Sequence, residues 1–233
     1  MSKRRYSVLL SCEHASNAVP EFLHPYFKSA RAKKNLNSHR GYDIGAAEVF
    51  RELTRILRPA FAIEGSYTRL AIDFNRNSDR NHRYSEFSEK ATPEEKERLE
   101  RIHADYRGAF LGAIRKEMSE KRFVQILHLS IHSFTPELDG KIRNAEIGIL
   151  YDPARKEEAA LARIWKERLK RIAPNIRVRF NYPYLGKTDG HTTALRKIFP
   201  QSEYLGFEIE MNQALFRKSR SEDIARMLAK IMA

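Results

Sequence analysis

Residues that can do chemistry follow the first apolar run of this sequence. Glu13 and His14 come directly after the run YSVLL, within the stretch SCEHASNAVP. The end of a strand needs only a turn, so an acid and an imidazole at this point suggest a further role. Side chains of the same kind end three other apolar runs: Asp73, Asn75 and Arg76 after RLAI, His132 after FVQILHLSI, and Glu208 and Glu210 in YLGFEIEM. One histidine at a strand end is usually structural, but four such ends together indicate a site.

Two histidines and a carboxylate can bind a metal ion. Three protein ligands with a fourth position open to water are typical of catalytic zinc, and because Cys12 is the only cysteine, the ligands here must be His, Asp or Glu. Such a zinc ion lowers the pKa of a water molecule and polarises a carbonyl, while a nearby carboxylate passes the proton to a leaving amine. Asn75 and Arg76 are expected to bind substrate, Arg76 through its planar guanidinium. The lack of a GxSxG sequence disfavours serine hydrolysis.

His128 and His132 have the spacing of a zincin helix, but their surroundings favour a strand. The first histidine is followed by Leu129 rather than by glutamate. Four residues of a strand span about 13 Å, which is too far for two imidazoles to share one ion. We therefore expect His128 to be a buried structural histidine and His132 to be the candidate ligand.

The elements that would position these residues alternate along the chain. Strands are expected at 6–11, 60–65, 68–74, 123–131, 147–152, 176–182 and 204–211, and helices at 43–57, 92–121, 156–172 and from 221 to the C-terminus. This order predicts an α/β fold in which a largely parallel sheet is covered by helices on both faces. In such folds the site lies beyond the carboxyl ends of the strands.

The last apolar run places two glutamates on one face of its strand. In YLGFEIEM, alternation puts Glu208 and Glu210 on the side opposite Phe207 and Ile209. Buried acids need a partner or a nearby cation, and Glu210 is two residues, about 6.6 Å, closer to the end of the strand. We expect Glu210 to act first as general base and then as acid, with Glu208 as its supporting neighbour.

The composition indicates a single domain over 1–233. The chain has 233 residues, 42% of them hydrophobic, and a net charge of +13. Such a charge can attract nucleic acid, but acids are interspersed with the bases at helical spacing, and no zinc-finger, RNP or GxxG sequence occurs, so nucleic acid is not the expected partner. The first apolar run is too short for a secretory segment or a membrane span, so a cytoplasmic protein is expected. The composition does not indicate an oligomeric state.

Seven stretches taken in order resemble one known family, the N-formylglutamate amidohydrolases and their relatives. The stretches are SCEHASNAVP, HRGYDIGA, TRLAIDFNR, SIHSFTP, IGILYD, KTDGHT and FEIEMNQ, which together cover almost the whole chain. The formylglutamate enzymes proper show a PHSG-like stretch where this chain has CEHASN, so the sequence is more similar to an EHASN-type branch.

The resemblance implies a fold, a reaction and a set of residues. The fold would be a three-layer α/β/α domain around a mostly parallel mixed sheet, like that of zinc-dependent exopeptidases. The reaction would be metal-assisted cleavage of an N-acyl amino acid, typically N-formyl-L-glutamate to formate and glutamate in histidine breakdown. By position in the family motifs, His14, Asp43 and His132 would hold the metal, Glu210 would be the catalytic carboxylate and Arg76 a substrate ligand.

Several assignments have an alternative. Asp43 opens an expected helix, so it can be an N-cap instead of a metal ligand, and Glu13 is then the other carboxylate in reach; we favour Asp43. His191, in the expected loop LGKTDGHTT, can contact substrate or stabilise an oxyanion. Arg143 precedes a strand and can bind a substrate carboxylate or lie in a solvated turn. Arg76 can instead pair with Asp73.

The sequence thus predicts a zinc-dependent amidohydrolase acting on a small anionic N-acyl amino acid. Two other functions remain as alternatives. One is a basic protein that binds a polyanion or nucleic acid and only retains the fold. The other is a metallopeptidase that acts on a peptide or a cell-wall fragment.

Overall fold

Six strands form one mixed sheet at the centre of the molecule. The computed structural model describes residues 6–77, 83–120 and 125–232. The sheet order is β2-β1-β3-β8-β6-β7. The strands are β1 (Tyr6–Cys12), β2 (Phe61–Glu64), β3 (Gln125–Phe134), β6 (Ile147–Leu150), β7 (Val178–Phe180) and β8 (Tyr204–Asn212). β2, β1, β3 and β8 run parallel, whereas β6 pairs antiparallel with β8 and parallel with β7.

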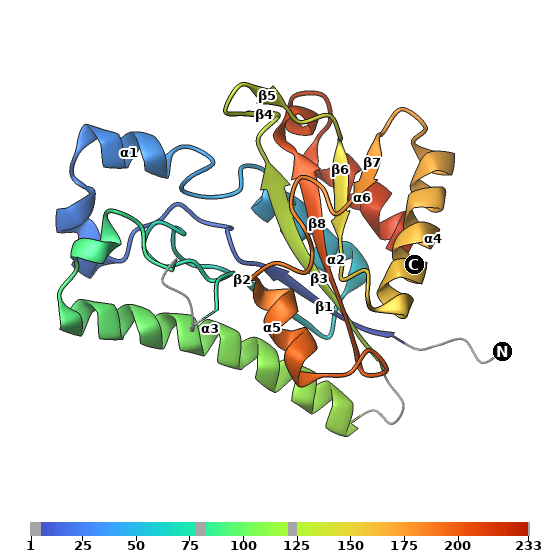
Figure 1. Ribbon diagram of the computed structural model, residues 1–233, viewed down its shortest axis with the longest axis horizontal. Coiled ribbons are helices and arrows are strands. Elements are labelled where there is room, and N and C mark those ends of the chain that lie inside the picture. The colour runs from blue at the N-terminus through green and yellow to red at the C-terminus, as the bar shows by residue number, and fades with distance from the viewer. Residues whose placement is uncertain (1–5, 78–82, 121–124, 233) are drawn as a thin grey trace.

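Helices cover both faces of this sheet, which confirms the predicted three-layer α/β/α fold (Figure 1). On one face lie α2 (Ala46–Leu57), α4 (Lys156–Ile172) and α6 (Ser221–Met232), and on the other lie the long α3 (Pro93–Glu120) and α5 (His191–Ile198). The remaining elements are α1 (Ala30–Leu36), the 3₁₀ helices η1 (Glu21–Phe27), η2 (Ser88–Lys90) and η3 (Gln213–Arg217), and a hairpin of β4 (Glu137–Leu138) and β5 (Lys141–Ile142). Similarity to the zinc-dependent exopeptidases stays a prediction.

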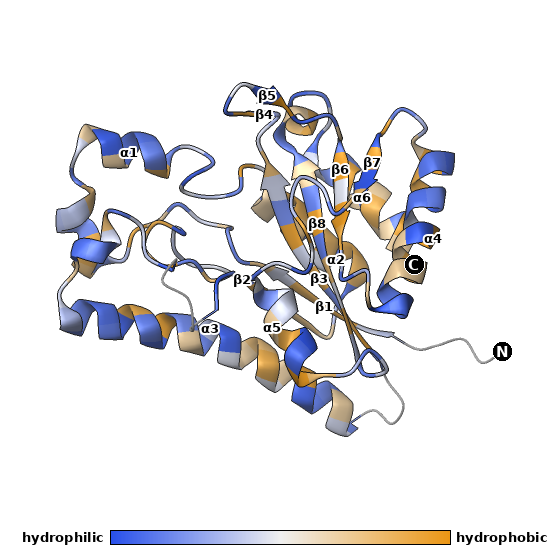
Figure 2. Ribbon diagram, viewed as in Figure 1, coloured by the Kyte–Doolittle hydropathy of each residue, from blue (hydrophilic) through white to orange (hydrophobic). Residues whose placement is uncertain are grey.

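The alternation of residues along β3 and β8 separates an apolar from a polar face. Leu127, Leu129 and Ile131 pack in the larger core with α2, α4 and α6. The intervening His128 and His132 belong to the face that α3 and α5 cover, together with Ser130. Figure 2 shows hydrophobic and hydrophilic colours mixed along β8, and the hydrophilic colour on the outer turns of α1 and α4. Three buried polar side chains of β3, His128, Ser130 and His132, therefore lie on one face of the sheet.

The start of α3 follows its sequence signal. Thr92 Oγ1 accepts a hydrogen bond from the Glu95 backbone at 3.3 Å, and Glu95 accepts one from the Thr92 backbone at 2.9 Å. This reciprocal arrangement is the capping box that the sequence predicts, with Pro93 at the first helical position. The helix continues through Gly108 and Gly112, both of which lie in open space.

The strand predicted at 68–74 is wrong, because this segment forms turns. The backbone of Ala71 bonds to Thr68 O at 2.9 Å, and Thr68 Oγ1 bonds to Gly41 O at 2.8 Å, so local contacts take up its hydrogen-bonding groups. Its apolar side chains are buried, but against η1, α1 and the first half of α3 instead of within the sheet. Alternating burial alone cannot distinguish these two environments.

Other boundaries differ less. β3 begins at Gln125 and ends at Phe134, three residues later than predicted, while 123–124 fall outside the described residues. Helix α4 has the predicted bounds, Lys156–Ile172. Among the described residues, no helix is both long and apolar enough to cross a membrane.

Candidate active site

The polar face of the sheet converges at the carboxyl ends of β1, β3 and β8. Ser130 of β3 lies opposite Glu208 of β8, and His132 lies opposite Glu210. All four side chains are buried on the face that α3 and α5 cover. Parallel strands end at the same edge, so this register brings the histidine and the glutamates of separate segments together.

His14, Asp43 and His132 form a compact cluster at this edge. Their potential ligand atoms all lie within 4.8 Å of one another, and each residue is at most 5% exposed. Asp43 Oδ2 is 2.9 Å from His132 Nδ1 and 3.5 Å from His14 Nδ1. The backbone N–H of Asp43 donates to His14 O at 2.9 Å, which fixes the two segments side by side. The structure thus brings together the three side chains that the sequence nominated as metal ligands.

Asp43 does not cap the helix that follows it. Helix α2 begins at Ala46, and its N-cap is Gly45, with φ of 82° and no side-chain cap bond. The Asp43 carboxylate instead accepts from the Ser133 backbone at 3.2 Å and pairs with Arg69. Of the two roles considered for Asp43, only the one at the cluster agrees with its contacts.

Each histidine of the cluster has its second ring nitrogen next to another side chain. His14 Nε2 lies 2.7 Å from Asp73 Oδ1, and His132 Nε2 lies 2.8 Å from Ser130 Oγ and 3.3 Å from Glu13 Oε2. Glu13 therefore approaches His132 from the side opposite Asp43.

Opposite charges determine the protonation of the cluster. Burial alone would raise the pKa of Asp43, but the charges of Arg69 and His14 and the bond with His132 outweigh it and hold that pKa well below its ordinary value. Burial disfavours the charged form of His132, yet hydrogen bonds with Asp43 and Glu13 raise its pKa well above the usual range. Without a metal, the negative charges of Asp43 and Glu13 thus favour the protonated form of His132.

These residues fit a divalent metal ion. His14 Nδ1 is buried and has no hydrogen-bond partner among the described residues, although its ring is held through Nε2. Two imidazole nitrogens and one carboxylate oxygen around a common point are a donor set suited to zinc, and carboxylates on the outer nitrogens are usual behind such ligands. An ion would give the unpartnered nitrogen a partner and would replace the proton on His132.

Glu210 stands beside the cluster with a raised pKa. Burial, together with the negative charges of Asp43 and Glu208, raises the pKa of Glu210 to about 8, although His132 and Arg69 act against the shift. Its Oε2 atom is buried and has no hydrogen-bond partner among the described residues. Glu208 differs, because its Oε1 accepts a bond from Thr192 Oγ1 at 2.8 Å. Of the two glutamates, Glu210 has the oxygen available for proton transfer.

A cavity opens next to the cluster and is lined by three arginines, Arg69, Arg76 and Arg143. Arg69 pairs with Asp43. Arg76 Nε lies 3.8 Å from Asp73 Oδ2, and its Nη1 donates to Asp189 O at 3.1 Å. The predicted alternative of an Arg76–Asp73 pair is thus present, although Arg76 still lines the cavity.

Arg143 is held by aromatic rings instead of by acids. Its guanidinium lies 5.3 Å from the ring centre of Tyr184 and 5.8 Å from that of Phe134, with Thr135 Oγ1 at 3.4 Å. Among the described residues, no carboxylate lies within ion-pair distance of it. Arg143 therefore does not lie in a simple solvated turn and keeps its charge unneutralised at the cavity.

His191 requires a correction. It lies at the start of α5 and not in a loop, it is fully buried, and it does not line the cavity. Its Nδ1 is 2.8 Å from Glu13 Oε1, and its backbone N–H donates to Asn75 Oδ1 at 2.7 Å. The loop expected around His191 is therefore wrong, whereas its contact with substrate stays a prediction that this buried position does not favour. Asn75 does line the cavity, but its amide oxygen already binds α5.

Some residues of the site were not singled out from the sequence. Arg69 and Ser130 carry no local signal, since a basic residue in a turn and a serine in a strand are common. Their roles follow from contacts with Asp43 and Glu13, which depend on register and on the path of the chain. Asp73 was seen only as a strand-end acid and as a partner of Arg76.

The fold and the cluster define the class of this protein: a three-layer α/β protein with a buried His–Asp–His cluster that could hold a metal ion near the carboxyl ends of parallel strands. The chain belongs to the N-formylglutamate amidohydrolase family, whose model matches residues 6–217. This membership confirms the resemblance seen in the sequence motifs and makes the protein a hydrolase of the amidohydrolase type.

Two solved structures have a similar fold. A gene product of Agrobacterium tumefaciens is 26% identical, with a TM-score of 0.79 over 98% of this chain and 90% of its own. An N-formylglutamate amidohydrolase from Ralstonia eutropha is 15% identical, with a TM-score of 0.67 over 99% of this chain and 92% of its own, which shows likeness of fold alone. None of the curated proteins matches this sequence.

Proposed function

We propose that this protein is a zinc-dependent amidohydrolase that cleaves the amide of a small N-acyl amino acid with two carboxylates, such as N-formyl-L-glutamate. One observation carries the proposal: Glu210, with an unpartnered oxygen and a raised pKa, lies beside the His14–Asp43–His132 cluster at the edge of an arginine-lined cavity. Perturbed acids next to metal-ligating side chains in a cavity are typical of catalytic sites.

His14, Asp43 and His132 would hold the zinc ion. The ion would polarise the acyl carbonyl, lower the pKa of an attacking water molecule and, by its charge, lower the pKa of Glu210 into the range of a general base. Glu210 accepts the proton of the water while the water oxygen bonds to the acyl carbon. It then delivers the proton to the nitrogen as the C–N bond breaks, which yields formate and a free amino group.

The cavity supports a small dianionic substrate. Its volume is about 230 Å³, which suits a small molecule better than a polymer. Arg143 has no acid partner among the described residues, and Arg76 is shared only loosely with Asp73, so each can bind one carboxylate. Because Arg69 neutralises Asp43, it is not assigned a substrate carboxylate.

Hydrolysis of a matched set of substrates tests this proposal. Zinc-loaded protein is assayed for release of the free amino group from N-formyl-L-glutamate, N-formyl-L-glutamine and the N-acetyl and N-succinyl derivatives of glutamate. We expect the N-formyl dicarboxylate to have the highest kcat/KM. Zinc-loaded protein that hydrolyses none of these compounds would contradict the proposed substrate class. A higher kcat/KM for N-formyl-L-glutamine than for N-formyl-L-glutamate would contradict the role of Arg76 and Arg143.

A further inference from the structure

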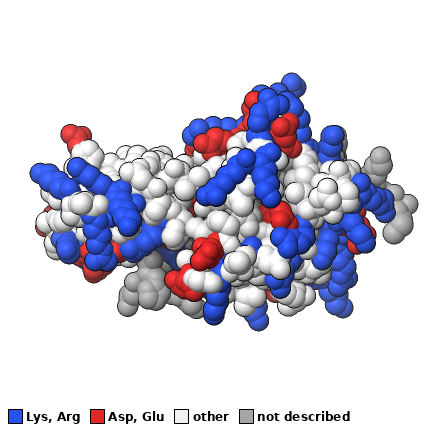
Figure 3. Space-filling model, turned by 90° about the horizontal axis from the view of Figure 1, so that it is seen from above, with Lys and Arg blue, Asp and Glu red and all other residues white. Residues whose placement is uncertain are grey.

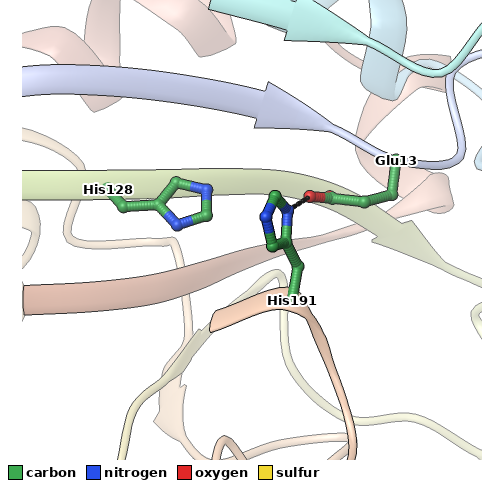
Figure 4. A group of neighbouring side chains, drawn as sticks. All are labelled: Glu13, His128 and His191. Carbon is green, nitrogen blue, oxygen red and sulfur yellow. Dashed lines mark hydrogen bonds and ion pairs between the residues drawn. The ribbon is translucent and has the colours of Figure 1, made fainter. Parts of the chain in front are cut away.

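Behind the cluster, Glu13 is fully buried among donors from two other elements, β3 and α5. Its Oε2 accepts from Ser130 Oγ of β3 at 2.6 Å and lies 3.3 Å from His132 Nε2, and its Oε1 lies 2.8 Å from His191 Nδ1 of α5. Figure 4 shows the His191 ring rising from α5 with this nitrogen directed at the Glu13 carboxylate. Glu13 does not line the cavity, so it cannot contact substrate directly.

The direction of these hydrogen bonds determines where one proton on His132 lies. A carboxylate only accepts, so the Ser130 hydroxyl must donate its hydrogen to Glu13. Ser130 Oγ then has only lone pairs left for His132 Nε2, which is 2.8 Å away, and this nitrogen must carry a hydrogen. His132 Nδ1 is thereby the nitrogen that can present a lone pair to a metal beside Asp43 and His14.

His191 is held in the orientation that Glu13 needs. Its backbone N–H is bound by Asn75 Oδ1 at 2.7 Å, which fixes the first residue of α5. Its ring packs edge-on against Phe110, with the centroids 4.9 Å apart. Since Glu13 accepts, His191 Nδ1 carries the hydrogen, and the other nitrogen, Nε2, is buried with no partner among the described residues.

We propose that Glu13 and His191 are positioning residues for His132: His191 holds Glu13, and Glu13, directly and through Ser130, keeps a hydrogen on His132 Nε2 and turns Nδ1 toward the metal. The metal itself rests on the proposed function, whereas the hydrogen-bond chain does not. Asp73 stands in the same relation to His14, so both histidines have a carboxylate behind them.

A second metal ion between Glu13, His128 and His191 is the competing explanation, because their potential ligand atoms also lie within 4.8 Å of one another. Both nitrogens of His128 are already engaged, Nε2 with Ser11 Oγ at 2.7 Å and Nδ1 with Tyr204 OH at 2.6 Å. Binding an ion there would break one of these buried bonds. The contacts therefore favour a positioning role over a second metal site.

Variants at position 191 separate the hydrogen bond from the volume of the ring. His191→Phe fills the space without a donor, whereas the amide of His191→Asn can stand in for the Nδ1 hydrogen. Glu13→Gln removes the charge that accepts both bonds. His128→Gln is the matched control, since His128 is equally buried on the same face but its ring nitrogens bond to Ser11 and Tyr204 instead of to Glu13. Circular dichroism establishes that each variant is folded.

The first measurement is zinc affinity, obtained by competition with a chelator, together with the zinc content per chain. We expect Glu13→Gln and His191→Phe to bind zinc about 10- to 100-fold more weakly, with His191→Asn recovering most of the loss and His128→Gln near the parent. Unchanged affinity in folded Glu13→Gln and His191→Phe would overturn the proposal. So would two zinc ions per chain in the parent and one in His128→Gln.

The second measurement needs no metal. Ring spectra of metal-free protein with ¹⁵N-labelled histidine should show slowly exchanging hydrogens on His132 Nε2 and His191 Nδ1, and Glu13→Gln should lose the protection of both. If the parent binds no zinc, the proposed function fails, but these spectra still decide the positioning role. A His132 with its hydrogen on Nδ1 alone would overturn it.

Discussion

The buried atoms of the candidate site that have no hydrogen-bond partner among the described residues include His14 Nδ1 and Glu210 Oε2. Leaving a buried polar atom unpaired costs roughly 1–3 kcal/mol, so sites that contain such atoms usually recover the cost when they bind a ligand. The neighbouring His132 has a partner at each ring nitrogen, and Glu208 has one at Oε1. At the scale of residues, the unpaired atoms mark where an ion and a reacting water would be bound.

Glu210→Gln should abolish most of the activity without removing the metal. The amide keeps the shape of the side chain but cannot accept a proton, so kcat should fall by at least about 10²-fold, a typical loss for general acid–base catalysis. Glu208→Gln is the matched variant and should cost less, because Glu208 already binds Thr192. Steady-state kinetics and zinc content check both. If Glu210→Gln has a normal kcat while Glu208→Gln is inactive, the roles of general base and supporting neighbour must be exchanged.

Arg143→Gln should weaken the preference for a dicarboxylate. A hydrogen bond to a charged group contributes about 1.5–3 kcal/mol, so kcat/KM for N-formyl-L-glutamate should fall roughly 10- to 100-fold, with a much smaller change for N-formyl-L-glutamine.

Arg76→Lys should also lower kcat/KM, since lysine lacks the planar fork.

Arg179→Gln is the control for Arg143. Arg179 also stacks on an aromatic ring, that of Tyr182 at 4.1 Å, but it does not line the cavity. Its loss should leave both substrates unchanged. If Arg143→Gln and Arg179→Gln behave alike, Arg143 does not bind the substrate carboxylate.

His14, His132 and Glu210 could be found from the sequence because each comes at the end of an apolar run, whereas Asp43 was assigned through the resemblance to the family motifs. His132 ends the most apolar run, and Glu210 follows from alternation in the last one. The residues behind them could not be found from the sequence. The hydrogen bond between Ser130 and Glu13 depends on the register of β1 against β3, which no local pattern shows. His191 was misplaced because its polar, glycine-containing surroundings suggest a loop rather than a buried helix start.

At the scale of elements, Gly45 allows the chain to pass from Asp43 into α2. Its φ of 82° lies in the left-handed region, and a Cβ there would come within 2.6 Å of the Phe216 ring. Gly45→Ala should therefore lower the free energy of unfolding by about 1–3 kcal/mol, as measured by urea denaturation.

Gly112→Ala is the opposite case. Gly112 lies in the exposed middle of α3 with nothing near the added methyl group, so alanine should raise the free energy of unfolding by about 0.5–1 kcal/mol. Equal effects of the two substitutions would show that the conformation of Gly45 is not constrained.

Strong local patterns explain which elements were predicted. Helix α3 has a capping box and a proline at its first position, and α4 ends shortly before Pro174; the predicted bounds of both agree closely with the structure. The segment 68–74 has the composition of a strand, but its apolar side chains pack in a separate core with Leu23, Phe27 and Leu99. No local pattern reports which core an apolar run joins, so this error could not be avoided without the tertiary contacts.

At the scale of the whole molecule, the positive charge is spread out. Figure 3 shows lysines and arginines distributed over one face of the molecule, with acidic side chains between them. Several arginines form surface ion pairs, among them Arg51 with Glu64 and Arg177 with Glu146. The net charge of +13 thus has no single stripe on this face that would follow a nucleic-acid backbone.

Buried neutral histidine should make the fold sensitive to acid. Burial holds the pKa of His128 well below its ordinary value, and the charges of His191, Arg196 and Arg107 lower it further. The negative charge of Glu13 acts in the opposite direction but does not outweigh them. The unfolded chain then binds the proton first, so stability present above pH of about 6.5 is lost as the pH falls toward the folded pKa.

The expected slope is at most about 1.4 kcal/mol per pH unit for this one group. Urea denaturation from pH 7.5 to 5 should show a steeper loss in the parent than in His128→Gln, which has no proton to bind. Parallel curves for the two proteins would contradict the assignment of a neutral, buried His128.

The central claim is that His14, Asp43 and His132 hold a zinc ion. Its most direct test is the zinc content of protein that has been stripped with a chelator, reloaded with zinc and freed of excess metal, compared with His14→Ala, His132→Ala, the double variant and His128→Gln. We expect one zinc per chain in the parent and in His128→Gln, and loss of stoichiometric zinc in the other variants. Full occupancy in the double variant His14→Ala/His132→Ala would contradict the account.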